Sequence, residues 1–349
     1  MPVFEALASD LQRLDAASRR RRLMPRAGTD FSSNDYLALA GDPALAAAVA
    51  EAIARGVPAG SGGSRLLRGN HPEHEVLEAE AARFFGAESA LWFSTGYAAN
   101  SAIVSSLPQR GDLVVYDDLI HASVHEGLRL TRTETAAASH NDVGAFADAI
   151  AAWRGRGGTG RVWIAVESLY SMDGDRAPLA DLAALAEAND AVLVIDEAHA
   201  TGVFGAGGRG LAAALEGREN VITLHTCGKA LGCEGALVCG PAVVTDFLVN
   251  RGRGFIFSTA PSPLMAAAVR AALRIIEGAD DRRARLAALI AHAERVLGPH
   301  GALCSGSQVM PVILGDDART MRAAATVQAA GFAVRGIRPP TVPAGTSRL

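Results

Sequence analysis

Short apolar runs alternate along most of the chain with longer stretches whose apolar residues recur every three or four positions. Runs bounded by polar turns predict buried strands, and the stretches between them predict helices. Strands are expected at 89–94, 113–117, 162–167, 191–196 and 221–224, and helices at 43–55, 72–86, 96–107, 119–130 and 179–188. This alternation predicts an α/β fold whose mostly parallel sheet lies between helices.

After Pro241 the pattern changes to longer helices at 264–277 and 282–297, followed by a strand at 308–314, a helix, and a strand at 332–337. We therefore expect an N-terminal segment at 1–45, a large domain at 46–240 and a smaller C-terminal α/β domain at 241–349. A two-stranded sheet at a chain end leaves an unpaired edge. The expectation is that the C-terminal domain is incomplete.

The composition describes a globular chain without a bias toward polyanions. Its 349 residues are 49% apolar, and the formal net charge is -4, which disfavours partners such as nucleic acid or an anionic membrane. The run Arg19–Arg22 is read as the end of an N-terminal helix, or as a source of one arginine for an anionic substrate. No secretory leader or membrane-spanning run is found, so a cytoplasmic protein is expected. The four cysteines lack zinc-site spacing and are taken as reduced.

One lysine, Lys229, follows an apolar run inside the stretch 223–232. The small residues Gly228, Ala230 and Gly232 leave room beside it for a flat group. An amine in such a place loses solvation, lowers its pKa and forms a Schiff base with an aldehyde, which is the chemistry of pyridoxal phosphate (PLP) enzymes. The alternative is an ordinary surface lysine after a strand.

A carboxylate, Asp196, ends the apolar run 191–196. Open α/β sheets bind ligands at the carboxyl ends of their strands. PLP requires an acid that keeps its pyridine nitrogen protonated, so Asp196 and Lys229 could hold opposite ends of one ring. His199 could hydrogen-bond the phenolic oxygen of the cofactor, or it could be a satisfied core histidine.

The stretch Ser94-Thr-Gly-Tyr97 places a turn between a strand and a helix. Free backbone N–H groups there would bind a phosphate, although a simple helix cap is the alternative. Thr226 would add a hydroxyl to the same phosphate. His121 and His125 lie four apart, but no third ligand is specified and no metal site is predicted. Stacking of His121 on an aromatic cofactor is the preferred interpretation.

The run Gly205–Gly210 matches the glycine pattern of dinucleotide-binding loops and supports a rival class, the nicotinamide-dependent oxidoreductases. Two features count against it. Residues 197–204 separate the glycines from the preceding strand, and no acidic residue follows about twenty positions later to bind a ribose.

Taken together, the motifs resemble those of the α-oxoamine synthases, PLP-dependent enzymes of the aspartate-aminotransferase fold, also called transferase fold type I. The motifs lie at 33–37, 60–65, 95–100, 121–123, 171–175, 196–199, 226–229 and 257–259. The resemblance implies that Lys229 is the Schiff-base lysine and that Asp196 contacts the pyridinium nitrogen. The remaining implied cofactor contacts are His199 at the phenolic oxygen, His121 over the ring, and Gly96, Tyr97 and Thr226 at the phosphate. Ser171 is also an implied cofactor-binding residue.

The resemblance also implies a homodimer, in which Thr259 reaches the phosphate from a partner subunit. Asn34 and Arg348 are the implied substrate-binding residues, with Arg348 at the amino-acid carboxylate. In the family the chain continues beyond the arginine motif, whereas this sequence stops at Leu349. The expectation is therefore a mobile Arg348.

Residues 336–346 resemble those members that condense L-alanine with a pimeloyl thioester of coenzyme A or acyl carrier protein in biotin synthesis. Lys229 would act as general base on the alanine Cα, and carbon dioxide would leave. A sister reaction, glycine with an acetyl or succinyl thioester, remains an alternative because it would use the same residues. A non-catalytic scaffold is disfavoured because the lysine, the acid and the histidines occur together.

Overall fold

The computed structural model describes residues 3–349, which form two compact units. The larger unit contains Asn34–Ser171 and Asp175–Ala287, and the smaller one contains residues up to Ser33, Met172–Gly174 and Ala288–Leu349. The sequence analysis expected a boundary after residue 240. The structure instead groups 241–287 with the larger unit, because the helices there pack their apolar faces into its core.

The larger unit is built on a seven-stranded sheet in the order β2-β8-β7-β6-β5-β3-β4. Its strands are β2 (Ser89–Phe93), β3 (Leu113–Asp117), β4 (Glu134–Ala138), β5 (Val162–Glu167), β6 (Val192–Asp196), β7 (Val221–Thr226) and β8 (Ala236–Gly240). Only β8 runs antiparallel to its two neighbours, β7 and β2. The predicted mostly parallel sheet is confirmed.

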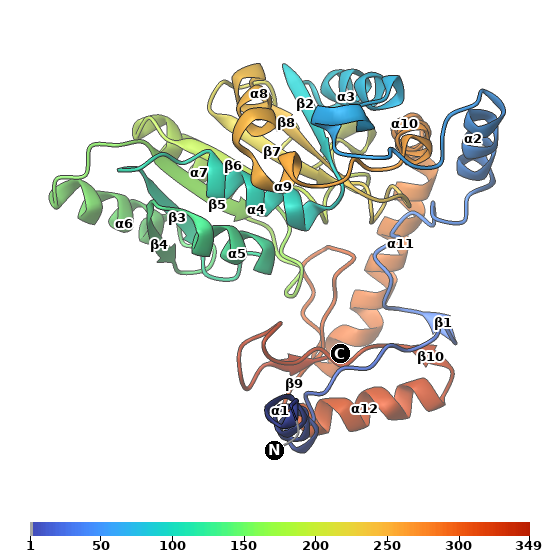
Figure 1. The fold of residues 1–349 in the computed structure, drawn as a ribbon. Coiled ribbons are helices and arrows are strands. Elements are labelled where there is room, and N and C mark those ends of the chain that lie inside the picture. The colour runs from blue at the N-terminus through green and yellow to red at the C-terminus, as the bar shows by residue number, and fades with distance from the viewer. Residues whose placement is uncertain (1–2) are drawn as a thin grey trace. The chain divides into compact units, whose positions relative to one another are not determined.

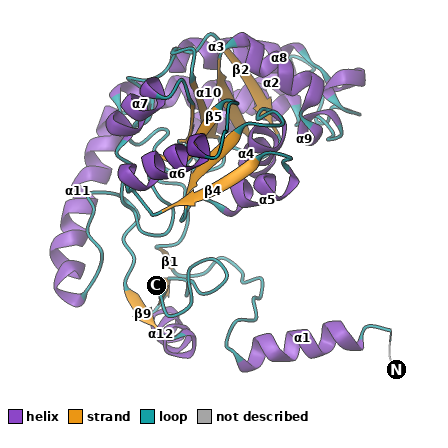
Figure 2. Cartoon of the chain, turned by 90° about the vertical axis from the view of Figure 1, so that its left-hand side faces the viewer, coloured by secondary structure: helices purple, strands orange, loops and turns teal. Residues whose placement is uncertain are grey.

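Helices cover the sheet on both sides (Figures 1 and 2). The helices of this unit are α2 (Pro43–Ala54), α3 (Pro72–Phe85), α4 (Gly96–Ser106), α5 (Ala122–Leu130), α6 (Val143–Gly155), α7 (Leu179–Ala188), α8 (Ala242–Arg251), α9 (Arg253–Ile256) and α10 (Pro263–Glu277), and α2 packs on α10. Along β5, Ile164 packs with residues of α6 and α7, whereas its neighbour Trp163 packs with residues of α4 and α5. Both faces of this strand are therefore buried, as is typical of parallel sheets.

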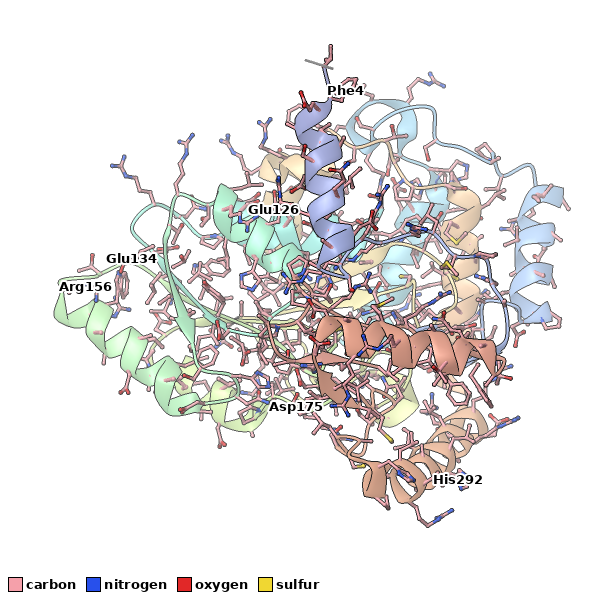
Figure 3. The ribbon with its side chains drawn as sticks, turned by 90° about the horizontal axis from the view of Figure 1, so that it is seen from below. Phe4, Glu126, Glu134, Arg156, Asp175 and His292 are labelled. Carbon is pink, nitrogen blue, oxygen red and sulfur yellow. The ribbon has the colours of Figure 1, made fainter. Side chains whose placement is uncertain are left out.

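The edge strand β4 and the helix after it were missed by the sequence analysis. The β4 sequence, Glu134-Thr-Ala-Ala-Ala138, has no alternation of large apolar residues, so its signal as a strand is weak. Glu134 forms an ion pair with Arg156, the residue that caps α6 (Figure 3). Charged side chains of this kind discourage further strand pairing at an edge.

The smaller unit contains α1 (Glu5–Ala16), α12 (Asp317–Ala329) and the second part of α11 (Asp280–Leu297). Two short strand pairs accompany them: parallel β1 (Thr29–Asp30) with β10 (Phe332–Ala333), and antiparallel β9 (Ile313–Gly315) with β11 (Ser347–Arg348). The strands predicted at 308–314 and 332–337 are thus much shorter than expected. Among residues 3–349, no helix combines the length and apolar character needed to span a bilayer.

Candidate active site

Lys229 lies in the turn after β7, where the backbone is held by hydrogen bonds. Cys227 N donates to Gly235 O, and Gly232 N donates to Lys229 O. Gly232 has a φ of 65°, and a Cβ there would lie 2.3 Å from Ala40 N, so only glycine fits this approach. Burial lowers the pKa of Lys229 below its usual value, although Asp196 and Glu167 oppose the shift. The lysine therefore supplies a neutral amine more readily than a surface lysine.

His199 is buried and connects Lys229 to the N-terminal part of the larger unit. Lys229 Nζ lies 2.6 Å from His199 Nε2, and Tyr36 Oη lies 2.7 Å from His199 Nδ1. Burial, together with the positive charge of Lys229, holds the pKa of His199 well below its usual value. The imidazole is therefore neutral. Because Lys229 donates to Nε2, the ring proton lies on Nδ1 and is donated to Tyr36.

Tyr36 then donates its hydroxyl proton to Asn34 Oδ1 at 3.1 Å. The predicted residues Asn34, His199 and Lys229 thus belong to one hydrogen-bonded series. Tyr36, which completes it, was not predicted to be a site residue.

Asp196 ends β6 and is only 5% exposed. Its Oδ2 accepts a hydrogen bond of 2.6 Å from Asn100 Nδ2, and its Oδ1 accepts one of 2.8 Å from Ala198 N. Asn100 also donates to Ser123 Oγ, which lies 2.7 Å from His121 Nδ1. Asp196 and His121 are therefore connected through two buried polar residues, Asn100 and Ser123, that the sequence analysis missed.

Glu167 is the neighbour of Asp196 in the β5–β6 ladder. It is 2% exposed, and its Oε2 accepts a hydrogen bond from Ser171 N. Burial and the nearby Asp196 carboxylate raise the pKa of Glu167 well above its usual value, so this side chain keeps its proton more readily than a surface glutamate does. It fixes the backbone of the predicted cofactor residue Ser171.

Gly96 and Tyr97 begin α4, which Thr95 caps by accepting a hydrogen bond from Ala98 N. Within residues 3–349, the N–H groups of Gly96 and Tyr97 have no hydrogen-bond acceptor. A Cβ on Gly96 would lie 3.7 Å from Thr226 Oγ1. The Thr95 cap uses the N–H group of Ala98. The N–H groups of Gly96 and Tyr97 are therefore still available to bind a phosphate.

Two predicted residues lie elsewhere. Thr259 lines a small hollow that also contains Ser94 and Arg65 of its own chain. Arg348 belongs to the smaller unit, where its side chain is 4% exposed and paired with Asp173. This burial differs from the mobile Arg348 that the sequence analysis expected. In the part of the chain that the structure describes, no three His, Cys, Asp or Glu side chains gather as a metal site would require.

The glycine run 205–210 does not have the geometry of a dinucleotide-binding loop. Gly205 has a φ of 75° and precedes a short 3₁₀ turn, Ala206–Gly208. The position of a Cβ on Gly210 is occupied by Glu197 Oε2. In a dinucleotide-binding loop the glycines open an α-helix whose start binds the pyrophosphate, whereas only a three-residue 3₁₀ turn follows Gly205 here. This removes the main support for the oxidoreductase alternative.

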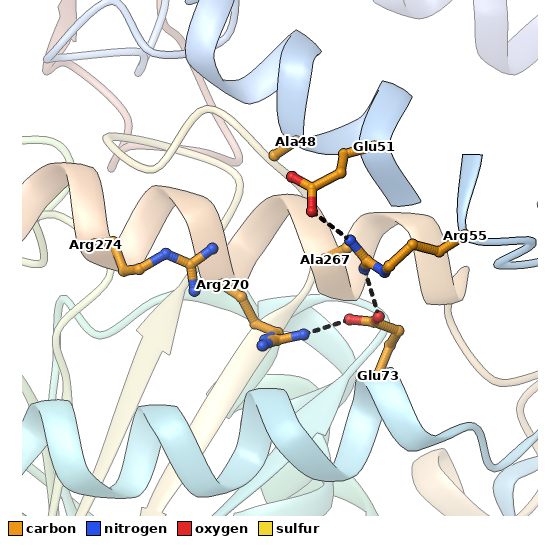
Figure 4. A pocket seen from close by; sticks show the side chains of 7 residues that line it. All are labelled: Ala48, Glu51, Arg55, Glu73, Ala267, Arg270 and Arg274. Carbon is orange, nitrogen blue, oxygen red and sulfur yellow. Dashed lines mark hydrogen bonds and ion pairs between the residues drawn. The ribbon is translucent and has the colours of Figure 1, made fainter. Parts of the chain in front are cut away.

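A separate hollow of about 270 Å³ lies between α2, α3 and α10 (Figure 4). Its walls carry a series of ion pairs in which Glu73 contacts both Arg55 and Arg270. None of the residues predicted to bind cofactor or substrate lines it. The ion pairs in its walls connect the three helices.

The residues at the β6–β7 edge fit the chemistry of PLP. Lys229 offers an amine of lowered pKa for an aldehyde, and Asp196 offers a buried carboxylate for a pyridinium. The unpaired N–H groups at the start of α4, with the Thr226 hydroxyl nearby, offer donors for a phosphate. A signal for Asn100 was present in the sequence, since it lies one helical turn after the glycine turn at 95–97, whereas Tyr36 and Ser123 have no local signal.

Comparison with known proteins places these features in a family. The family profile "Aminotransferase class I and II" matches residues 26–349. A protein of Anaeromyxobacter dehalogenans named 8-amino-7-oxononanoate synthase is 43% identical over 359 residues, covering 98% of this chain and 89% of that protein. One of the same name from Geobacter sulfurreducens is 41% identical over 363 residues, covering 99% of this chain and 92% of that protein.

Solved structures of PLP-dependent enzymes have the same fold as this chain. Serine palmitoyltransferase of Sphingomonas wittichii superposes with a TM-score of 0.90 at 27% identity, covering 99% of this chain and 91% of that chain. An 8-amino-7-oxononanoate synthase of Francisella tularensis superposes with a TM-score of 0.76 at 26% identity, covering 92% of this chain and 90% of that chain. A serine palmitoyltransferase variant from S. paucimobilis was solved with a bound PLP–myriocin aldimine. The predicted resemblance and fold are confirmed: the chain belongs to the family of class I and II aminotransferases.

Proposed function

We propose that this chain condenses L-alanine with a pimeloyl thioester to give 8-amino-7-oxononanoate and carbon dioxide, the product for which its curated relatives are named. One geometric observation carries the proposal. At the carboxyl edge of β6 and β7, the Lys229 amine of lowered pKa lies 2.6 Å from a neutral His199, and the buried Asp196 lies on the strand beside it.

PLP is the cofactor that these residues would hold. Lys229 would bind its carbonyl carbon, Asp196 its pyridine nitrogen, and the start of α4 with Thr226 its phosphate. His121, His199 and Ser171 would contact the ring and its phenolic oxygen. When bound, PLP supplies an electron sink for negative charge on the substrate Cα.

Lys229 would then act as the base that takes the Cα proton of L-alanine, because its lowered pKa leaves a neutral amine available. A carbon–carbon bond forms between this Cα and the thioester carbonyl, and the carbon–sulfur bond breaks to release a thiolate, which takes a proton from solvent. The bond from Cα to the carboxylate breaks to release carbon dioxide. Lys229 returns its proton to the same carbon, so that the overall reaction balances.

A second copy of the chain is the proposed partner, with Thr259 of one subunit near the phosphate of the other. Exposed apolar side chains in the larger unit support this assembly: Leu67 is 81% and Phe257 is 71% exposed. Side chains of this size are usually covered at interfaces. The thioester carrier is coenzyme A or acyl carrier protein, and both carry the acyl group on the same phosphopantetheine thiol.

The test uses the purified protein loaded with PLP and supplied with a pimeloyl thioester on either carrier. We expect carbon dioxide release with L-alanine, and much less with glycine or L-serine. Borohydride reduction should attach PLP to the wild type at Lys229, but not to Lys229→Ala. Turnover that persists in Lys229→Ala, or a preference for glycine or serine, would refute the proposal.

A further inference from the structure

Arg348 is held in the smaller unit by three hydrogen bonds from its guanidinium group. Its Nε donates to Thr346 O at 3.0 Å, and its Nη1 donates to Met172 O at 3.0 Å and to Asp173 Oδ1 at 2.7 Å. Its backbone is also fixed, because Arg348 N and O both bond with Ile337. The arginine is therefore pre-positioned, and its charge is already paired.

The bonding leaves few donors for a ligand. A guanidinium has five N–H groups; the contacts above use the one on Nε and both on Nη1. Among residues 3–349, only the two on Nη2 have no acceptor. A carboxylate binds arginine most strongly through parallel N–H groups on two different nitrogens. Such binding at Arg348 requires one existing acceptor to leave.

Asp173 is the acceptor that is able to leave. The other two acceptors are backbone carbonyls, whereas Asp173 contributes a side chain that is 24% exposed. The backbone beside it is anchored: Gly174 has a φ of 75°, a Cβ there would lie 2.1 Å from Val309 O, and its carbonyl accepts a hydrogen bond from Ser305 Oγ. The Asp173 carboxylate can therefore rotate away from Arg348 while its backbone stays in place.

We propose that Asp173 competes with the amino-acid carboxylate for Arg348 and thereby sets the affinity for the amino acid. The incoming carboxylate displaces the Asp173 carboxylate from Nη1 and takes the Nη1–Nη2 pair. This inference rests on the proposed function and on the role that the family resemblance implies for Arg348, contact with the substrate carboxylate.

The competition has two consequences. Without substrate, Asp173 prevents Arg348 from remaining buried as an unpaired charge, which would be costly. With substrate, an amine that lacks a carboxylate cannot displace Asp173 and gains nothing from Arg348. The preference for α-amino acids over simple amines therefore comes from Arg348, and Asp173 lowers the net affinity for the amino acid.

The test compares the PLP-loaded wild type with Asp173→Asn, in which an amide oxygen still accepts from Nη1 but the negative charge is absent. Equilibrium binding of L-alanine is measured from the visible absorbance of the cofactor, alongside L-alaninol, which has no carboxylate. We expect the Kd for L-alanine to fall by about threefold or more in Asp173→Asn, and the Kd for L-alaninol to stay within about twofold.

Asp317→Asn is the matched control, because the Asp317 carboxylate bonds with Ser347 Oγ and Arg19 rather than with Arg348. Its Kd for L-alanine should equal that of the wild type. An unchanged or weaker affinity for L-alanine in Asp173→Asn would overturn the inference, as would an equal gain for L-alaninol. Arg348→Met tests the proposed function separately: its affinity for L-alanine should fall by about a hundredfold, and an unchanged affinity would refute the carboxylate assignment whatever Asp173→Asn does.

Discussion

The hydroxyl of Tyr36 lies 2.7 Å from Nδ1 of His199 and, because it donates its own proton to Asn34, it accepts the proton on that ring nitrogen. Nε2 is then the acceptor that faces Lys229 Nζ. Tyr36 acts on the lysine through the histidine, without a direct hydrogen bond between the two.

Tyr36→Phe should slow the attachment of PLP to Lys229. In Tyr36→Phe the proton on His199 Nδ1 has no hydroxyl to bond with. The tautomer that leaves a lone pair on Nε2 is then less stable by about one hydrogen bond. We expect the attachment rate, measured by borohydride trapping at fixed times, to fall roughly fivefold.

Tyr116→Phe is the matched control, since the Tyr116 ring packs edge-on against His125 and its hydroxyl makes no hydrogen bond within residues 3–349. It should attach PLP at the wild-type rate. Equal rates in Tyr36→Phe and the wild type would mean that Tyr36 does not set the tautomer.

Asp196→Asn tests the acid that we propose faces the pyridine nitrogen of PLP. The amide can keep the hydrogen bonds of Asp196 but cannot hold a proton on the ring. Borohydride should still attach PLP at Lys229, while turnover with L-alanine should fall by about a hundredfold or more. The exposed Asp118, changed to Asn, provides a control. Wild-type turnover in Asp196→Asn would remove this residue from the mechanism.

Much of the sheet was predictable because its strands are apolar on both faces. The predicted strands at 113–117 and 162–167 have the bounds of β3 and β5, and the apolar runs before Asp196 and Lys229 placed both residues at one edge of the sheet. The alanine-rich β4 lacks such a run and was missed. The antiparallel β8 was missed as well.

Side-chain partners that depend on tertiary contact were not predictable. Asn100 and Asp196 are 96 positions apart, and Tyr36 and His199 are 163 apart, so no spacing in the sequence relates them. The smaller unit joins the residues up to Ser33 with those from Ala288 onward. This too depends on a contact between distant positions, since β1 pairs with β10. Local patterns describe elements, whereas these contacts arise only from their packing.

His140 should make stability depend on alkaline pH. Burial opposes its charge, but hydrogen bonds with Asp117 and Asp175, both 2.8 Å, raise its pKa to about 10. Protonated His140 therefore stabilises the folded state. This stabilisation is complete below pH 6.5, the pKa of the histidine in the unfolded chain, and it is lost as the pH rises toward 10. His140→Asn should therefore lower the thermal midpoint by roughly 2–4 °C near pH 6.

The difference between wild type and His140→Asn should shrink as the pH approaches 10. His292 provides the control, because it is exposed on α11 (Figure 3) and, among residues 3–349, its side chain forms a hydrogen bond only with Arg295, one helical turn away. His292→Asn should leave the midpoint unchanged at every pH. A constant difference for His140→Asn between pH 6 and 10 would contradict the charged state of His140.

Glu73 joins three helices through its ion pairs, as Figure 4 shows. Its carboxylate lies 2.8 Å from Arg55 and 2.6 Å from Arg270. Burial opposes its ionisation, but the hydrogen bonds from both arginines outweigh this effect and lower the pKa of Glu73. A lowered pKa gives stability that is present above the unfolded value of 4.5 and is lost as pH falls below it.

Glu73→Gln should therefore lower the thermal midpoint at pH 7 by roughly 1–2 °C, because two guanidinium groups lose their shared anion in a site that water only partly screens. Glu51→Gln is the matched control: Glu51 pairs with the same Arg55 at 3.1 Å, but its side chain is 74% exposed. Since exposed pairs contribute little, Glu51→Gln should change the midpoint by less than about 1 °C. Equal effects of the two substitutions would mean that Glu73 does not hold α2 to α3 and α10, and that its partial burial adds nothing to a surface ion pair.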